Sequence, residues 1–200
     1  MVKNIFIIAL MGMVNIVIAQ QSSQSNKTIS VCLSNSEMKL YNLVMEYRLQ
    51  NGLPSIPLSA SLCFVAQQHC KDLINNKPKT SVCNMHSWSS NGSWSSCCYT
   101  PDHKNAACMW NKPRELTNYK GNGYEIAFYV WSSASATYTA EPEEALKGWK
   151  GSPGHNDVII NKNIWKSANW NSIGIGIYYG YATIWFGEEK DTETIPQVCN

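Results

Sequence analysis

Two histidines and one glutamate are the side chains in this sequence best suited to form a chemical centre: His86, Glu125 and His155. They lie far apart in the chain, so their spacing carries no signal and only the fold can bring them together. His155 lies in the first turn of a predicted helix, where the helix dipole favours the neutral imidazole. Neutral imidazole binds metal or accepts a proton, and two histidines with a carboxylate could hold zinc with one position open. The alternative for each histidine is an ordinary structural hydrogen bond.

Eight cysteines form the second informative set, and an even number in an exported chain predicts four disulfides. Cys97 and Cys98 are adjacent, so we expect them to reach different partners. Cys32 and Cys199 bracket the folded region and are candidates for joining its ends, whereas the other pairings stay open. A cysteine zinc site is the competing interpretation, but the sequence contains no C-x2-C pair. The eight are Cys32, Cys63, Cys70, Cys83, Cys97, Cys98, Cys108 and Cys199.

The first residues predict export. Residues 1–19 have a basic start, an apolar run and a small residue, Ala19, at the predicted cleavage site, which is the layout of a signal peptide. A membrane anchor is the alternative, but the run is shorter than the roughly 20 residues that span a bilayer. We therefore expect a secreted, extracellular protein without a transmembrane segment. Asn26 and Asn91 lie in N-x-[ST] motifs and are candidate glycosylation sites.

Composition and charge narrow the function classes. The 200 residues suit one domain, and 44% of them are hydrophobic, which is enough for a core. The net charge of +2 argues against a nucleic-acid partner, which usually requires a clear basic excess. Eight tryptophans and ten tyrosines argue against a disordered chain.

Helices dominate the first part of the chain. Ser34 and Glu37 form a capping box that opens the first helix, and Ser59 caps a second. On the second helix, Cys63 and Cys70 share a face because they are seven residues apart. The periodic positions of this helix are Leu62, Val65, Ala66, His69 and Leu73. Residues 80–122 lack periodicity and predict a long, disulfide-pinned loop with room for a short helix.

Strands and short helices fill the second part. Residues 124–130 predict a strand, residues 141–149 a third helix, and Ser152 caps a short fourth helix. Near the end, isoleucines alternate with Gly174 and Gly176, so one face of that strand is bare and lets a helix or ligand come close. Helices first, strands late and a closing hairpin predict an α+β fold.

Several segments, in order along the chain, resemble the CAP superfamily, or SCP domain, which includes cysteine-rich secretory, antigen 5 and pathogenesis-related 1 proteins. The matching segments are 46–54, 59–67, 85–88, 141–156 and 173–187. The most specific is Ser152-Pro153-Gly154-His155-Asn156, which is similar to the microbial-type signature of the family.

The resemblance implies an α-β-α sandwich with a central, mostly antiparallel sheet and a disulfide-rich loop insertion. It also implies a cleft lined by two histidines and two acids, onto which His86 and His155 carry over. The family pattern Gly-Glu-Asn-Ile-Ala stands here as Gly-Tyr-Glu-Ile-Ala, so either Tyr124 or Glu125 faces the cleft. The position of the second acid falls near Ser152. The weaker cleft candidates are Tyr124, Glu144 and Ser152.

The predicted organisation has four parts: a signal peptide (1–19), a flexible lead (20–33), a CAP domain (34–190) and a C-terminal tail (191–200) tied by Cys199. By this resemblance we expect an extracellular binding module for a lipid, a sterol or a divalent metal, in defence or signalling. Its partners would include an extracellular protein or glycan, and the metal would be weakly bound zinc.

A metal-assisted hydrolase or peptidase is the alternative function. In it, His86 and His155 would bind the metal and Glu125 would act as a ligand or general base. Neither H-E-x-x-H nor G-x-S-x-G occurs in the sequence. A minor third hypothesis is carbohydrate stacking by Trp88, Trp94 and Trp110.

Overall fold

The computed structural model of the chain describes residues 27, 29–133, 135 and 137–199. The predicted signal peptide, much of the predicted lead and Asn26 lie outside these residues. Within the described part of the chain, no helix is long and apolar enough to cross a membrane. The elements are α1 (Asn35–Gln50), α2 (Ala60–Asn75), α3 (Ala106–Trp110), α4 (Lys112–Leu116), β1 (Tyr124–Tyr129), α5 (Pro142–Lys150), α6 (Pro153–Ile159), a 3-10 turn η1 (Asn163–Trp165), β2 (Ser172–Tyr178) and β3 (Tyr181–Gly187).

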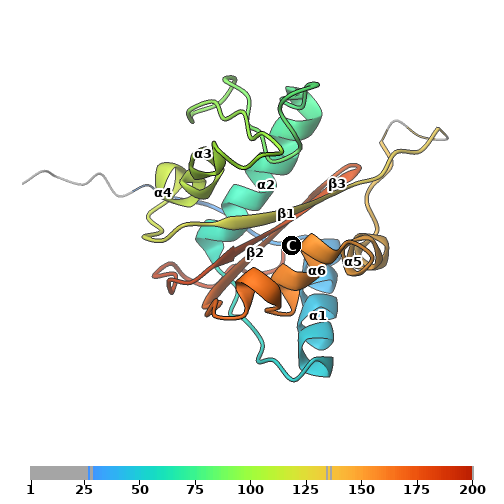
Figure 1. Ribbon diagram of the computed structural model, residues 1–200, viewed down its shortest axis with the longest axis vertical. Coiled ribbons are helices and arrows are strands. Elements are labelled where there is room, and N and C mark those ends of the chain that lie inside the picture. The colour runs from blue at the N-terminus through green and yellow to red at the C-terminus, as the bar shows by residue number, and fades with distance from the viewer. Residues whose placement is uncertain (1–26, 28, 134, 136, 200) are drawn as a thin grey trace, which may run out of the picture.

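Three antiparallel strands form the central sheet, in the order β1-β3-β2. On one face lies α2, together with the segment that contains α3 and α4, and on the other lie α1, α5 and α6 (Figure 1). Two apolar cores fill the spaces between these layers. The α+β sandwich expected from the sequence is thus confirmed.

The two long helices begin where their capping residues predict. Ser34 accepts a hydrogen bond from the backbone N–H of Glu37, whose side chain in turn accepts from the backbone N–H of Ser34. Ser59 caps α2 through the backbone N–H of Leu62. These capping bonds, reciprocal in α1 and single in α2, satisfy N–H groups that a helix leaves unpaired at its start.

Glycine lets α2 approach the sheet closely. A β-carbon on Gly174 would lie 2.0 Å from the carbonyl carbon of Leu62, and one on Gly176 would lie 2.4 Å from that of Ala66. The bare face of β2 therefore accommodates the backbone of a helix. The close approach brings the side chains of α2, including His69, onto the sheet.

Three disulfides form, and the prediction of four is wrong. The bonds join Cys32 to Cys199, Cys83 to Cys98 and Cys97 to Cys108, so the adjacent pair reaches different partners and the first bond joins the ends of the domain. Two of the three bonds lie within residues 80–122, where the structure also places the short helices α3 and α4.

Cys63 and Cys70 are free and buried. Seven residues of α-helix separate their α-carbons by roughly 10 Å, whereas a disulfide requires about 4.4–6.8 Å. The thiol of Cys70 instead donates to the carbonyl oxygen of Gly176 at 3.4 Å. Both residues serve as small apolar side chains between α2 and the sheet.

Candidate functional site

A fully buried carboxylate lies at the centre of the site. The side chain of Glu125, on β1, has no exposed surface and contacts two imidazoles. Its Oε1 is 2.5 Å from Nδ1 of His69, and its Oε2 is 2.8 Å from Nδ1 of His86. One carboxylate thus joins α2, the sheet and the loop after α2.

His69 is fixed on all sides. Its ring stacks on Trp88, with centroids 4.3 Å apart and an interplanar angle of 8°, and its Nε2 donates to the carbonyl oxygen of Ser87 at 3.0 Å. Because a carbonyl oxygen only accepts, Nε2 carries a proton. A second proton is shared in the hydrogen bond between Nδ1 of His69 and Oε1 of Glu125.

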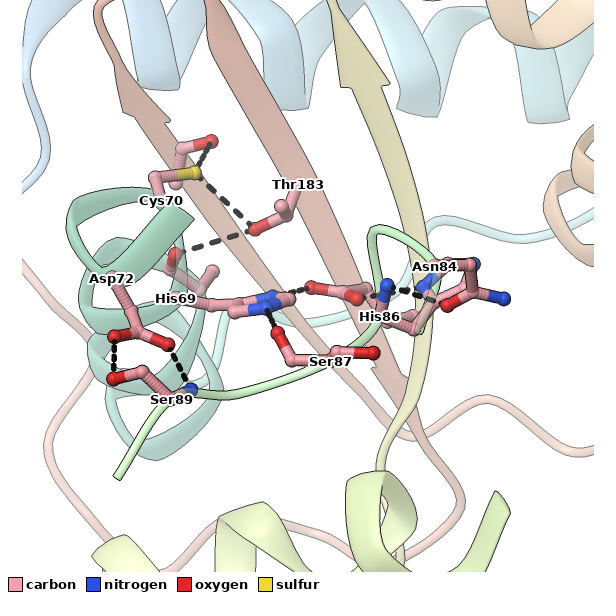
Figure 2. A network of polar contacts seen from close by, with 11 residues as sticks. His69, Cys70, Asp72, Asn84, His86, Ser87, Ser89 and Thr183 are labelled. Atoms are coloured by element: carbon pink, nitrogen blue, oxygen red, sulfur yellow. Dashed lines mark hydrogen bonds and ion pairs between the residues drawn. The ribbon is translucent and has the colours of Figure 1, made fainter. Parts of the chain in front are cut away.

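His86 lies on the opposite side of this network from α2 (Figure 2). Its backbone N–H donates to Oδ1 of Asn84 at 2.9 Å, which fixes the loop. Its Nδ1–H donates to Glu125, so Nε2 is a hydrogen-bond acceptor whenever the ring is neutral, and 18% of the side chain is exposed. The carboxylate selects the tautomer and orientation of the ring, as carboxylates do for histidines in many functional sites.

The electrostatics of this cluster favour an ionised carboxylate. Burial by itself would raise the pKa of Glu125, but the attraction of His69 and the hydrogen bonds from both histidines outweigh it, and the pKa is lowered. The pKa of His155 lies below its ordinary value because the ring is partly buried and because His86 disfavours a second positive charge. Glu125 opposes this effect, so His155 lies within electrostatic range of both residues.

An aromatic cavity of about 500 Å³ opens along the edge of the site, and residue Glu125 is part of its lining although its carboxylate is buried. Tyr124 and Glu125 both border it. The Tyr124 ring packs against Trp110 of α3 and Trp165 of η1, with centroids 5.7 and 5.1 Å apart. The residues that line the cavity are Tyr99, His103, Met109, Trp110, Tyr124, Glu125, Val158, Ile164 and Trp165.

A polar pair borders the same cavity. The hydroxyl of Tyr99 lies 2.8 Å from Nδ1 of His103, and the Tyr99 ring is also 5.2 Å from that of His86. The cavity thus combines large aromatic surfaces with a few polar groups, which is typical of small-molecule sites.

The sequence matches the cysteine-rich secretory protein family, CAP, over residues 41–186. The chain belongs to the CAP family. A search of the curated proteins finds no match.

The fold is similar to that of a solved SCP-domain protein. An extracellular protein with an SCP domain from Bacillus anthracis aligns with a TM-score of 0.51 at 17% identity, over 80% of this chain and 45% of that protein. A cysteine-rich secretory protein from Staphylococcus aureus gives 0.47 at 14% identity, over 78% of this chain and 39% of that one. An outer surface protein from Borrelia burgdorferi gives 0.49 at 17%, over 81% and 100%. This chain therefore spans less than half the length of the first two proteins.

In this CAP domain, the predicted site residues separate into two groups. His86 and Glu125 are in direct contact, and His155 is electrostatically coupled to both. Glu144 instead accepts a hydrogen bond from the hydroxyl of Tyr138 at 3.3 Å. Ser152 is the N-cap residue of α6, although its side chain makes no capping hydrogen bond.

His69 was absent from the predicted site. The sequence does indicate that His69 is unusual, because it is a titratable residue at one of the periodic, buried positions of α2. A buried histidine requires partners for both ring nitrogens, and the partners are supplied by β1 and by the loop after α2. Helix periodicity therefore places His69 in the core but does not identify its hydrogen-bond partners.

The residues do not fit a three-ligand zinc site. Both carboxylate oxygens of Glu125 accept from imidazoles, which makes this residue an orienting group. Within the residues that the structure describes, no group of three or more histidine, cysteine, aspartate or glutamate side chains could hold a metal ion. Weak zinc binding by His86 and His155 alone stays a prediction.

Proposed function

We propose that this CAP domain is an extracellular module that binds a small lipid or sterol in the cavity beside Glu125. The observation that carries the proposal is the aromatic cavity of about 500 Å³, a volume within the range of about 300–1,000 Å³ usual for ligand sites. Trp110, Tyr124 and Trp165 offer flat apolar surfaces to such a ligand.

The polar groups at the cavity favour a ligand with one polar end. The Tyr99–His103 pair can exchange hydrogen bonds with a hydroxyl, whereas both oxygens of Glu125 are already engaged. We therefore expect the apolar body to lie against Trp165 and the hydroxyl to lie near Tyr99. The three disulfides suit an oxidising, extracellular location. No contact among the described residues favours the hydrolase alternative.

Titration with dehydroergosterol and cis-parinaric acid, with tryptophan-to-probe energy transfer as the signal, tests the proposal. We expect Trp165→Ala to weaken binding by about tenfold, because a packed aromatic contact contributes about 1.4 kcal/mol or more. The matched control is Trp131→Ala, since Trp131 is 70% exposed and does not border the cavity. Failure of both probes to bind the wild type, or equal binding by both variants, would contradict the proposal.

A further inference from the structure

The loop after α6 carries an isoleucine that the fold does not cover. Ile164, in η1, is 84% exposed and at the same time borders the aromatic cavity. A single exposed apolar side chain is common on protein surfaces. This one continues the apolar lining of a cavity outward to the surface, so its exposure is tied to the proposed binding site.

Two exposed lysines flank this isoleucine. The local sequence is Lys162-Asn163-Ile164-Trp165-Lys166, and both lysines are exposed, whereas Trp165 is half-buried in the cavity wall. The nearby carboxylate, that of Asp157, accepts a hydrogen bond from the side chain of Asn163 at 2.6 Å. The segment presents an apolar tip between two positive charges, with the negative charge of Asp157 beside it.

Side-chain hydrogen bonds hold this loop in place. Asn161 and Asn163 have φ angles of 49° and 53°, a left-handed conformation that asparagine tolerates better than most residues. The side-chain amide of Asn161 donates to the carbonyl oxygen of Ala168 at 2.8 Å, and its oxygen accepts from the buried Arg48 at 2.7 Å. The fold thus positions Ile164 outward by defined contacts.

We propose that residues 162–166 contact the surface of an anionic lipid bilayer, a step that rests on the proposed lipid-binding function. Ile164 inserts among the headgroups while Lys162 and Lys166 pair with lipid phosphates or carboxylates. Apolar tips with flanking lysines suit the membrane interface in this way. The cavity then opens at the bilayer, where a lipid can pass between the membrane and the protein.

Vesicle cosedimentation tests this contact, with phosphatidylcholine vesicles that contain or lack phosphatidylserine. We expect the wild type to bind the anionic vesicles and Ile164→Ser to lower the partition coefficient about tenfold. The matched control is Leu49→Ser, since Leu49 is 60% exposed at the end of α1, and it should bind like the wild type.

The lysines are tested separately. The double variant Lys162→Gln, Lys166→Gln should lose binding to anionic vesicles by about tenfold or more, whereas Lys71→Gln, Lys79→Gln should retain it. Wild-type protein that binds neither kind of vesicle, or equal losses in the loop variants and their controls, would overturn the inference. Soluble-probe binding without vesicle binding refutes the membrane contact alone, and vesicle binding without soluble-probe binding refutes the cavity function alone.

Discussion

Glu125→Gln and His69→Ala should have very different effects on stability, although they alter the same buried contact. A glutamine at position 125 keeps an oxygen that accepts from Nδ1–H of His86, and its amide can donate to Nδ1 of a neutral His69. His69 then still donates to the carbonyl oxygen of Ser87 through Nε2, as it does in the wild type. Every polar atom of the network keeps a partner in this variant.

The expected magnitudes follow from these contacts. Replacing a buried ionic contact by a fully paired neutral one is often close to neutral, so Glu125→Gln should change the free energy of unfolding by about 1 kcal/mol or less. His69→Ala leaves Glu125 buried without one partner and removes the ring stacked on Trp88. It should destabilise the protein by about 3–5 kcal/mol.

Urea unfolding at neutral pH, followed by tryptophan fluorescence, measures both free energies, and equal m-values would show that the comparison is valid. If Glu125→Gln is as destabilising as His69→Ala, the ionic charge is essential and the reasoning from paired hydrogen bonds is wrong. If His69→Ala costs less than about 1 kcal/mol, the buried contact does not form as described.

Two further predictions concern the thiols and the acid range. In the unreduced protein, two thiols should react with a thiol reagent after denaturation and almost none before it. The reason is that Cys63 and Cys70 are buried, and burial raises the pKa of Cys63 to about 12. If no thiol reacts after denaturation, the protein has four disulfides as the sequence predicted. In pH titrations of stability, the lowered pKa of His155 favours the folded state above its ordinary value of 6.5, and this contribution is lost as pH falls through the folded pKa. The lowered pKa of Glu125 likewise favours the folded state above its ordinary value of 4.5, and this contribution is lost as pH falls through the folded pKa. His155→Gln should therefore remove the loss of stability that begins below pH 6.5, and Glu125→Gln the loss that begins below pH 4.5.

Local signals predicted most of the fold. Ser34 and Ser59 mark the helix starts through side-chain bonds that span only three residues, so the information is contained in a short segment. The glycines of β2 indicated a close approach, and the structure identifies the approaching element as α2. The family pattern indicated His86 and left Tyr124 and Glu125 as alternatives for the acid, and the structure places the carboxylate of Glu125 against His86.

Local sequence patterns did not predict the features that depend on contacts between distant segments. Cysteine counting assumed that every thiol finds a partner, whereas the helix holds Cys63 and Cys70 apart along its axis. The cavity is assembled from the loop that contains Tyr99 and His103, from α3, from β1, and from α6 with the segment after it, which are distant in sequence. None of these segments contains a sequence pattern that predicts a cavity.

Covalent mapping of the bound lipid is the most direct test of lipid binding in the aromatic cavity. A sterol or fatty acid with a photoactivatable group would be bound to the wild type, irradiated, and located by peptide mass spectrometry. We expect labelling on the cavity walls, at Met109, Trp110 or Trp165, and loss of labelling on competition with unmodified lipid. Labelling confined to exposed aromatic residues outside the cavity, such as Trp131, or labelling that excess lipid does not displace, would contradict it.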